Sequence, residues 1–562
     1  MIKIKIDFEK LLLAAFFALL LFIGPGITLN HKIMHDFPYG YSASDAFQHQ
    51  VRAEAVKDAG SFRHDAPYIS FGIENLVGRY PPVIYHLAVL LSYSAGLEVY
   101  DSIYFIVFFF TVIGILIMYF IIKNFNKNVA LISLPLAILA FSLPPSIGFL
   151  WGHWPSLLAQ FFLIAFAWCI TNINLEKSYI LTSVILAAIA LTHSSEAAFA
   201  IIFAGLFFVV GFISNRLEKN FAKKFFISII LFFILASYYL VIFYNTWAKA
   251  QPYSFAVMPT WEGNPGFYLA GFGLLLLFIL LGILFSLLKI SSMHASIVFA
   301  FAMLISGFSN YIGFDTRAFQ IRFFWPIYLS VFFGFGIYAL LKSITKKSSM
   351  AFSIILFLLF TILLSGMIKL PFMDNKISLL GQEMTAMPHY KGSSSQGVMD
   401  SYHWSALKWL SKKSGHNSKV YFFYGDIYSQ DALLRNSKRF HYQVDPKDFI
   451  KAIQEKKIKK SYISELPGDS GGRPVTRSGL FSFEDAMTSK PDEYFFGPQS
   501  ICNFDYLVFD KVSQQQALAQ YNLLIASELL KKDYIKKAFE NEIVVILKNN
   551  NKGADCIEER SF

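Results

Sequence analysis

The chain has 562 residues, of which 55% are hydrophobic and 15% charged, and its formal net charge is +11. Because a soluble globular domain carries about 25% charged residues, this composition excludes an ordinary soluble enzyme. The apolar residues stand in long runs, and several of these reach the roughly 20 residues that cross a bilayer. We therefore expect a polytopic α-helical membrane protein. Its lysines report orientation in the membrane and imply no nucleic-acid partner.

The first apolar run, Leu11–Phe22, follows Lys3, Lys5 and Lys10. A basic segment before an apolar one is typical of a signal peptide, but no small-residue cleavage site follows cleanly. The sequence therefore predicts an uncleaved first helix with a cytoplasmic N-terminus.

The loop after this helix contains "GYSASDAFQHQVRAEAVKDAG", which brings Asp45, His49 and Arg52 close together. Serine is a frequent helix cap and glycine a frequent helix stop, so Ser44 and Gly60 predict a helix over 45–59. The spacing i, i+4, i+7 puts the three side chains on one face. Two interpretations stay open: a solvated amphipathic helix, or a face that carries chemistry.

Orientation follows from basic loops in the second half of the membrane part. Lysine and arginine gather at 216–224, 289–294 and 342–347, and two crossings separate each loop from the next. The positive-inside rule makes these loops cytoplasmic. Everything after about 370 then lies outside. The longer apolar runs that support this count are Ile103–Ile122, Gln160–Ile170, Ala197–Val210, Phe225–Phe243 and Leu269–Leu288.

Parity singles out one apolar segment that does not cross. The chain must cross an odd number of times between an outer loop near 80 and the inner loop near 215, yet six apolar segments stand there. Segment 81–97, "PPVIYHLAVLLSYSAGL", is short and begins with two prolines, so we predict that it stays on the outer side. The expected total is about 11 transmembrane helices, in which segment 129–145 is one crossing.

The last third of the chain has a different composition. Asp400 or Ser401 predicts the cap of a helix in "DSYHWSALKWLSKK", and "DPKDFIKAIQEKK" and a segment from about Ser513 also have helical patterns. The stretches "KVYFFYG", "FDYLVFD" and "NEIVVILKN" read as strands. We expect a transmembrane domain over 1–370, with an outer loop at 30–101 that holds two surface helices. An extracytoplasmic α/β domain follows over 371–562.

The three cysteines have different settings. Cys169 lies in an apolar run and is expected to be inert packing. Cys502 and Cys556 lie in the C-terminal part and are free to pair if that part faces an oxidising compartment.

The order of these loop elements resembles a known superfamily. "GYSASDAFQHQVRAEAVKDAG" after the first helix, then "YPPVIYHLAVLLSYSAGL", then a helix beginning near Asp101, resembles the lipid-dependent membrane glycosyltransferases of the GT-C fold. These include the oligosaccharyltransferase catalytic subunit and archaeal and bacterial mannosyl- and arabinosyltransferases. In that superfamily an essential Asp follows the first helix, a histidine often stands four residues after it, and a Tyr-Pro-Pro element heads the next loop helix. Asp45, His49 and Tyr80 match these features.

The resemblance implies a sugar transfer from a polyprenyl-phosphate or -pyrophosphate donor to a glycan or protein acceptor. The reaction would then take place on the extracytoplasmic face of the cell membrane, in contact with its lipids. Asp45 is then the catalytic base, with His49 and Arg52 orienting it or contacting the donor phosphate. Arg79, Arg317 and Arg322 are candidate cations for the leaving phosphate.

Further candidates lie at the outer ends of the predicted helices. His193 and Glu196 in "LTHSSEAAFA" are ionisable groups at membrane depth, which bind a substrate or satisfy one another. His153 stands between two tryptophans, so it either contacts a sugar or belongs to an interfacial anchor. Tyr80 heads the loop helix and is a candidate substrate contact. For Arg317, a salt bridge to Asp315 is the structural alternative.

The sequence also departs from the superfamily. The oligosaccharyltransferases carry an acidic pair in their second outer loop and a Trp-Trp-Asp-Tyr-Gly motif in their outer domain. Here the matching loop is "SLPPSIGFLWGHWP", with no acidic residue, and the outer domain offers "FFYGDIYS". The metal therefore stays open: Mg²⁺ or Mn²⁺ would be the ion, with Asp45 as a ligand if one binds.

Two other classes compete with the enzyme. One is a non-catalytic envelope or assembly protein that keeps the fold. The other is a lipid or solute transporter, which would show repeated halves and ionisable groups near the midplane. No clear repeat is present in the sequence, and consumption of a polyprenyl-linked sugar would separate the remaining two classes.

Overall fold

The computed structural model groups the chain into two compact units, which we describe separately. The helical unit comprises Met1–Met34 and Gly78–Gly392, and the α/β unit comprises His35–Val77 and Ser393–Phe562. The structure describes residues 8–28, 36–60, 80–141, 147–217, 219–244, 273–292, 294–308, 325–345, 350–365, 398–423, 425, 427–428, 431–443, 501–512, 523 and 525–551.

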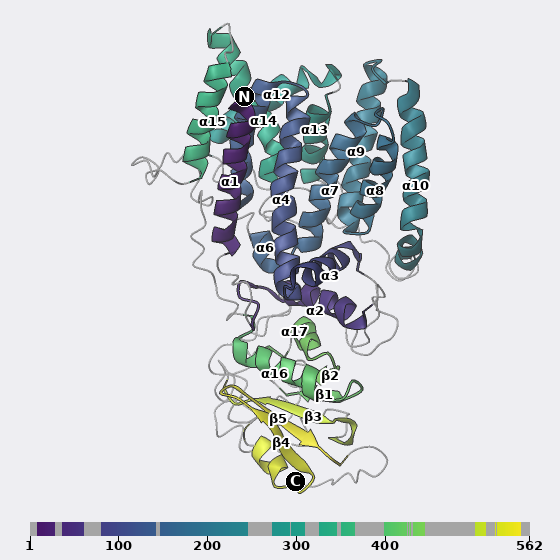
Figure 1. Cartoon of the computed structure of the whole chain (residues 1–562), viewed down its shortest axis with the longest axis vertical. Helices are drawn as coiled ribbons and strands as arrows, with labels where there is room; N and C mark the ends of the chain where they lie inside the picture. The colour runs from purple at the N-terminus through teal and green to yellow at the C-terminus, as the bar shows by residue number, and fades with distance from the viewer. Residues whose placement is uncertain are drawn as a thin grey trace, which may run out of the picture. The chain divides into compact units, whose positions relative to one another are not determined.

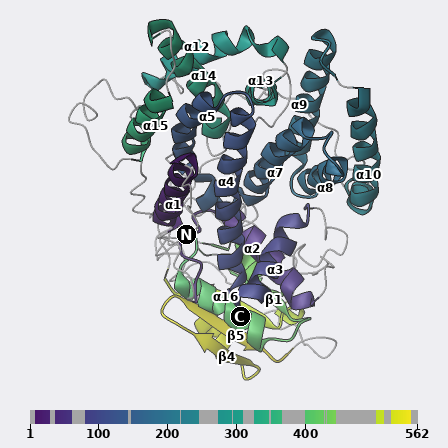
Figure 2. The same cartoon turned by 45° about the horizontal axis from the view of Figure 1, so that its top comes forward.

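The helical unit is built from roughly aligned helices, which Figure 1 shows from the side and Figure 2 after a 45° turn. In chain order its elements are α1 (Phe8–Thr28), α3 (Val83–Ala95), α4 (Val99–Lys123), α5 (Lys127–Ser133), η3 (Leu134–Phe141), α6 (Ile147–Trp151), α7 (Trp154–Thr171), α8 (Ser178–Ala190), α9 (Ser194–Ile213), α10 (Lys219–Phe243), α12 (Leu275–Leu287), η6 (Ile290–Ser292), α13 (Ala295–Gly307), α14 (Trp325–Thr345) and α15 (Met350–Leu364).

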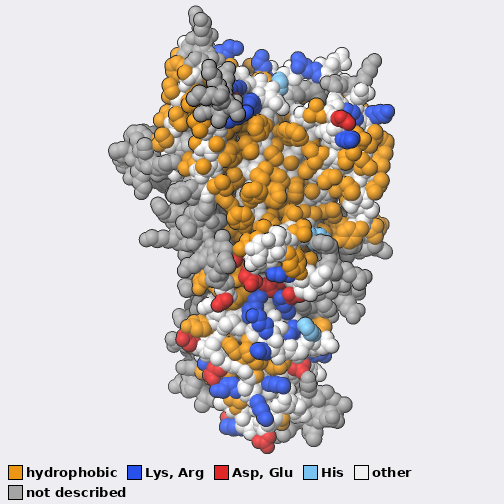
Figure 3. All heavy atoms as spheres, viewed as in Figure 1, with side chains coloured by type: hydrophobic (Ala, Val, Ile, Leu, Met, Phe, Trp, Pro, Cys, Tyr) orange, Lys and Arg blue, Asp and Glu red, His pale blue; other side chains and the backbone are white. Residues whose placement is uncertain are grey.

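Five of the described helices are long and apolar enough to cross a membrane, namely α4, α7, α9, α10 and α14. Hydrophobic side chains cover most of the face of this unit seen in Figure 3. On α10, Phe226, Phe233 and Ile234 are each more than half exposed. Since a soluble protein does not leave so large an apolar surface in water, the chain is an integral membrane protein. The expected total of about 11 crossings stays a prediction.

One predicted crossing is not a continuous α-helix. Segment 129–145 begins in α5, where the Asn126 side chain caps the helix by accepting from two backbone N–H groups. The chain then tightens into the 3₁₀ helix η3, which contains Pro135. Proline lacks an N–H and its ring collides with the carbonyl one turn earlier, which explains the break.

Two of the basic loops lie together at one end of the helical unit, which we call the basic end. Arg216, after α9, donates to the Ser292 carbonyl after α12 at 3.1 Å. Lys224 donates to the Asn174 carbonyl after α7 at 2.6 Å. Lysine and arginine side chains also gather at this end in Figure 3. The loops 216–224 and 289–294 therefore share one side, as parity requires.

The first helix is packed into the unit at the same end. The Glu9 side chain is buried and accepts a hydrogen bond from Tyr119 of α4 at 2.7 Å. It also forms ion pairs with Lys123 and Lys127. A carboxylate buried this deeply needs such partners, so α1 is tied to α4 and α5 by charge as well as by apolar packing.

Helix α3 lies at the opposite end, which we call the His193 end. The Val83 N–H, at the start of α3, donates to the Leu191 carbonyl between α8 and α9 at 3.0 Å. Its last residue, Ala95, shortly precedes the first residue of α4. The helix is about 20 Å long, whereas a bilayer core is about 30 Å thick. Since α8, α12 and α13 are equally short, the expectation that 81–97 does not cross stays a prediction.

The α/β unit combines a loop helix with a small sheet. Its elements are α2 (Ser44–Ala59), α16 (Ser401–Lys413), β1 (Lys419–Phe422), α17 (Asp431–Leu434), η10 (Arg435–Ser437), β2 (Phe440–Gln443), η13 (Ile501–Asn503), β3 (Tyr506–Asp510), β4 (Ile535–Glu540) and β5 (Val544–Asn549). The strand order is β2-β1-β3-β5-β4. Strand β1 is parallel to β2 and β3, while β5 is antiparallel to β3 and β4. Every residue of the central β3 is buried.

The predicted C-terminal elements are partly recovered. Helix α16 begins after Asp400, whose carboxylate accepts from the N–H groups of Tyr402 and His403. The three predicted strands correspond to β1, β3 and β5, whereas β2 and β4 were not anticipated. The helix predicted in "DPKDFIKAIQEKK" lies outside the described residues, and so does most of the helix predicted from Ser513.

The grouping of the first loop differs from the sequence-based one. The prediction assigned 30–101 to the transmembrane domain, but the contacts group residues 35–77 with the C-terminal segment. Helix α2 therefore belongs to the same compact unit as the sheet, although more than 300 residues separate α2 from α16 along the chain. The predicted boundary at 370 lies outside the described residues.

Candidate active site

The loop helix α2 has nearly the predicted bounds but a different cap. Its N-cap is Ala43, in an extended conformation and without a side-chain cap bond, so Ser44 is the first helical residue rather than the cap. At the other end Gly60 has φ 59° and its N–H returns to the Lys57 carbonyl. Glycine adopts this left-handed conformation at little cost, which explains why the helix stops there.

The three predicted site residues of α2 have unequal environments. Asp45 lies in the first helical turn and is exposed. His49 and Arg52 are only 4% and 7% exposed, so the predicted shared face is not one open surface. Most of the helix is buried, and this excludes the solvated amphipathic helix. The helix dipole favours negative charge at the N-terminus of α2, where Asp45 lies.

A residue that the sequence analysis did not select, Glu54, carries the strongest charge network of α2. Lys408 of α16 contacts both carboxylate oxygens at 2.8 Å, and Lys438 lies 2.8 Å from Oε2. Gln50, one helical turn earlier, donates to Oε1. Burial raises the pKa of the Glu54 carboxyl, but the two lysine charges outweigh this effect and lower the pKa to about 2. Glu54 is therefore locked in its charged form.

In the helical unit, two predicted residues form a buried pair at the His193 end. His193 Nδ1 lies 2.6 Å from Oε2 of Glu196, whose side chain is completely buried in the first turn of α9. Gln160 of α7 donates to the other Glu196 oxygen at 3.4 Å, and the Tyr328 hydroxyl of α14 donates to Gln160 at 3.1 Å. The cluster joins three helices. A carboxylate on Nδ1 orients the imidazole so that Nε2 points away from it.

Gln160 and Tyr328 were missed from the sequence, although a signal was present. Gln160 interrupts the apolar run "SLLAQFFLIAF", and a polar group inside a membrane helix must find a partner. Tyr328 gives no comparable signal, because tyrosine is ordinary near membrane interfaces.

The remaining predicted residues are only partly testable. Tyr80 and His153 are described and half-buried at the start of α3 and of α7. The His153 ring lies 6.5 Å from that of Trp151, centroid to centroid, which fits the interfacial anchor. Arg79, Arg317 and Arg322 lie outside the described residues.

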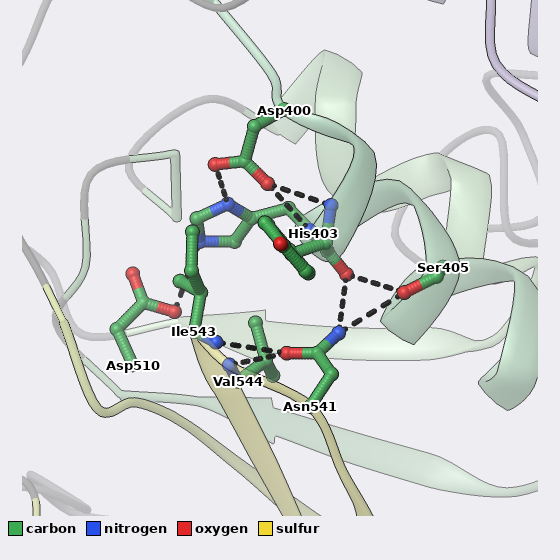
Figure 4. Close-up of polar contacts among 8 residues, drawn as sticks. Asp400, His403, Ser405, Asp510, Asn541, Ile543 and Val544 are labelled. Carbon is green, nitrogen blue, oxygen red and sulfur yellow. Dashed lines mark hydrogen bonds and ion pairs between the residues drawn. The ribbon is translucent and has the colours of Figure 1, made fainter.

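A second histidine, also missed from the sequence, is buried at the edge of the sheet (Figure 4). His403 of α16 has Nδ1 2.7 Å from Asp400 and Nε2 3.0 Å from Asp510, the last residue of β3. Burial lowers the pKa of His403, but the two carboxylates outweigh it and raise it to about 10. Any side chain in place of Gly425, just beyond β1, would collide with the Asp510 carboxylate. The imidazolium is therefore locked between two acids.

The described residues do not assemble a metal site. Among the described ranges, no group of three or more His, Cys, Asp or Glu side chains could hold an ion. Within these ranges, the side chains around Asp45 therefore do not form a binding site for the Mg²⁺ or Mn²⁺ that the sequence left open.

Comparison with known proteins gives a fold but no sequence family. No protein-family model matches the sequence, and no curated protein matches it. The structure is similar to the archaeal oligosaccharyltransferase AglB from Archaeoglobus fulgidus in complex with an inhibitory peptide and a dolichol-phosphate. Here the TM-score is 0.50 and the identity 13%, over 93% of this chain and 72% of that chain.

It is also similar to ArnT from Cupriavidus metallidurans. With undecaprenyl phosphate bound, the TM-score is 0.51 and the identity 10%, over 97% of this chain and 99% of that chain. In the apo state the TM-score is 0.50, over 96% and 98%. The resemblance drawn from the loop motif is thus confirmed for the fold, and the chain has the GT-C fold of the membrane glycosyltransferases.

Proposed function

We propose that the chain is a membrane glycosyltransferase that moves a sugar from a polyprenyl-phosphate or -pyrophosphate donor to a glycan or protein acceptor. One observation carries this proposal. The similarity to ArnT, solved with undecaprenyl phosphate, extends over 97% of this chain. AglB is solved with dolichol-phosphate. Both ligands are polyprenyl phosphates, which supports the same class of lipid carrier for this chain.

In the proposed reaction an acceptor hydroxyl or amide attacks the anomeric carbon of the sugar. The bond from that carbon to the phosphate oxygen breaks, and the lipid phosphate leaves with the bonding electrons. The acceptor proton passes to the Asp45 carboxylate. The exposure of Asp45 and the dipole of α2 support this role. His49 and Arg52, one and two turns further along, are its proposed supports.

The leaving phosphate needs cations or strong hydrogen-bond donors. His193 is half-buried, and the Glu196 carboxylate contacts its Nδ1 and directs Nε2 away from the pair. A donor so oriented suits a phosphate oxygen. We assign the same role to Arg79, Arg317 and Arg322, and substrate contact to Tyr80. His153 is the weakest of these assignments because the anchor explains it as well.

For orientation, we propose that the basic end is cytoplasmic and that the α/β unit lies outside the cell membrane. The cysteines support this independently. Cys502 is disulfide-bonded, whereas Cys169 is free in a membrane helix. Disulfides persist in oxidising compartments and are rare in the cytoplasm.

The proposal is tested with detergent-purified protein and a polyprenyl-phosphate-linked sugar. The wild type should consume the donor, and Asp45→Asn should transfer about 10²-fold more slowly or worse, because the amide cannot take the proton. Asp533→Asn, an exposed acid before β4, serves as the matched control.

Full transfer by Asp45→Asn would reject Asp45 as the base. A wild type that is monodisperse yet consumes no polyprenyl-linked sugar would favour the non-catalytic envelope protein.

A further inference from the structure

One face of α16 contacts the loop helix at two separate points. Trp404 and Lys408 are four residues apart and so lie on the same face. The Trp404 ring packs against Phe47 of α2, with centroids 6.1 Å apart, and its indole N–H donates to the Asp36 carbonyl at 2.6 Å. The first contact point therefore lies beside the turn of α2 that carries Asp45.

The second contact point is the ion pair between Lys408 and Glu54. The Lys408 ammonium lies 4.4 Å from the centre of the Trp404 ring and 2.8 Å from both Glu54 oxygens. Phe47 and Glu54 are about 10 Å apart along the helix, at ~1.5 Å per residue. Two contacts at that separation fix the direction of α2 as well as its distance from α16.

Helix α16 is itself held on the sheet by a different set of bonds (Figure 4). His403 joins it to Asp510 of β3. Asn541, in the turn between β4 and β5, donates to the Tyr402 carbonyl and the Ser405 hydroxyl at 2.9 and 3.0 Å. The side-chain oxygen of Asn541, Oδ1, in turn accepts from the backbone N–H groups of Ile543 and Val544. The sheet thus fixes the position of α16, and α16 fixes the position of α2.

We infer that Trp404 and Lys408 are positioning residues for glycosyl transfer: they hold α2 so that Asp45 stands at a fixed place. This rests on the proposed function only in taking Asp45 as the base. A displacement of about 1 Å in a reacting group costs on the order of 10²-fold in rate. The C-terminal segment is accordingly part of the machinery that presents the base.

The experiment compares variants on two faces of α16. Trp404→Phe removes the N–H donor and shrinks the ring, and Lys408→Met removes the charge at similar length. The matched controls are Trp409→Phe, whose ring packs on Tyr506 and Phe539, and Lys413→Met, which is exposed and lies off the tested face. Transfer kinetics are measured beside amide hydrogen exchange of α2 and β3.

We expect kcat to fall about 10-fold or more in both test variants while the donor KM stays within about 2-fold, since only the base is misplaced. Exchange should rise in α2 and stay unchanged in β3. Lys408→Arg, which keeps the charge, should recover most of kcat. Both controls should behave as the wild type.

Three results would overturn the inference: unchanged exchange in α2, an equal rise in α2 and β3, or an equal loss of kcat in the controls. Hydrogen exchange needs no turnover. If the wild type transfers no sugar, the proposed function fails, and exchange in α2 still decides whether Trp404 and Lys408 hold the helix.

Discussion

Two of the buried glutamates, Glu54 in the α/β unit and Glu196 in the helical unit, are stabilised by different kinds of partner. Glu54 in the α/β unit is paired with Lys408 and Lys438. Glu196 in the helical unit is paired with His193 and hydrogen-bonded to Gln160. Lysine keeps its charge at every physiological pH, whereas histidine gains and loses a proton near neutrality. The first pair fixes a geometry, whereas the second belongs to our proposed site for the leaving phosphate.

Because the two glutamates have different partners, we expect Glu54 to contribute mainly to stability and Glu196 mainly to the proposed reaction. Removing the charge of Glu54 leaves two lysines facing a neutral group in a buried place, which is costly. Removing the charge of Glu196 leaves neutral or neutralisable neighbours that an amide can still contact. The same substitution, glutamate to glutamine, should therefore damage the fold in one unit and the reaction in the other.

The largest effect is expected for Glu54→Gln. Breaking one side of a buried ion pair lowers the free energy of unfolding by about 3–5 kcal/mol. For a unit of about 200 residues this lowers the melting temperature by roughly 6–20 °C. Calorimetry of the full-length protein in detergent measures it, with Glu528→Gln, a surface acid paired with Lys531, as the control. A shift no larger than that of the control would show that the Glu54 network contributes little.

A structural feature could be predicted from the sequence only where the residues that produce it lie close together along the chain. The bounds of α2, the Asp400 cap and the apolar helices follow from periodicity and capping, which involve residues a few positions apart. The Glu54–Lys408 pair joins residues 354 positions apart. Beside Asp58, Glu54 reads as one more solvated charge, so no local pattern could reveal the pair.

The sheet and the buried cluster show the same limit. Strand β4 contains Lys536 and Lys537 and lacks the apolar alternation that marks a strand. His193 and Glu196 were found because ionisable groups in apolar runs stand out. Tyr328, which donates to Gln160, was not found, because its role depends on packing between α7 and α14 that the sequence does not encode locally.

The next effect is the pH dependence of the α/β unit through His403. Its pKa is raised from the ordinary value of 6.5 to about 10 in the fold by Asp510 and Asp400, in spite of burial. Its stabilisation is therefore complete below about pH 6.5 and is lost as the pH rises through about 10. We expect His403→Gln to cost about 2–4 kcal/mol at neutral pH.

Melting temperatures between pH 6 and 11 check this expectation. The wild type should lose its advantage over His403→Gln progressively and approach it near pH 11. Parallel curves for the two proteins would mean that the imidazolium charge does not stabilise the sheet. The phenol ring of Tyr428 lies 5.8 Å from the His403 ring, centroid to centroid, so Tyr428→Phe serves as the control.

A smaller free-energy change, but a functional one, is expected for Glu196→Gln. The amide retains contact with Gln160 and His193, so the melting temperature should move by no more than about 2–4 °C, which corresponds to about 1 kcal/mol. Transfer should nevertheless fall about 10-fold, because the His193 ring, our proposed donor to the leaving phosphate, loses the carboxylate that orients it. Unchanged transfer with a lower melting temperature would reverse the assignment and make Glu196 structural.

The smallest effects separate the two roles of Asp400. One carboxylate oxygen accepts from the N–H groups of Tyr402 and His403, and the other contacts the His403 ring at 2.7 Å. Asp400→Asn keeps an oxygen for the cap but loses the charge, and Asp510 still faces the imidazolium, so the loss should be about 0.5 kcal/mol. Asp400→Ala removes the cap as well and should cost about 1–1.5 kcal/mol. Ser401→Ala, at the exposed next position, is the control for substitution at the start of α16. If the asparagine and alanine variants have the same melting temperature, the Asp400 cap adds no stability. The N-terminus of α16 would then be held by the ion pairs of His403 alone, as α2 is held by the ion pairs of Glu54.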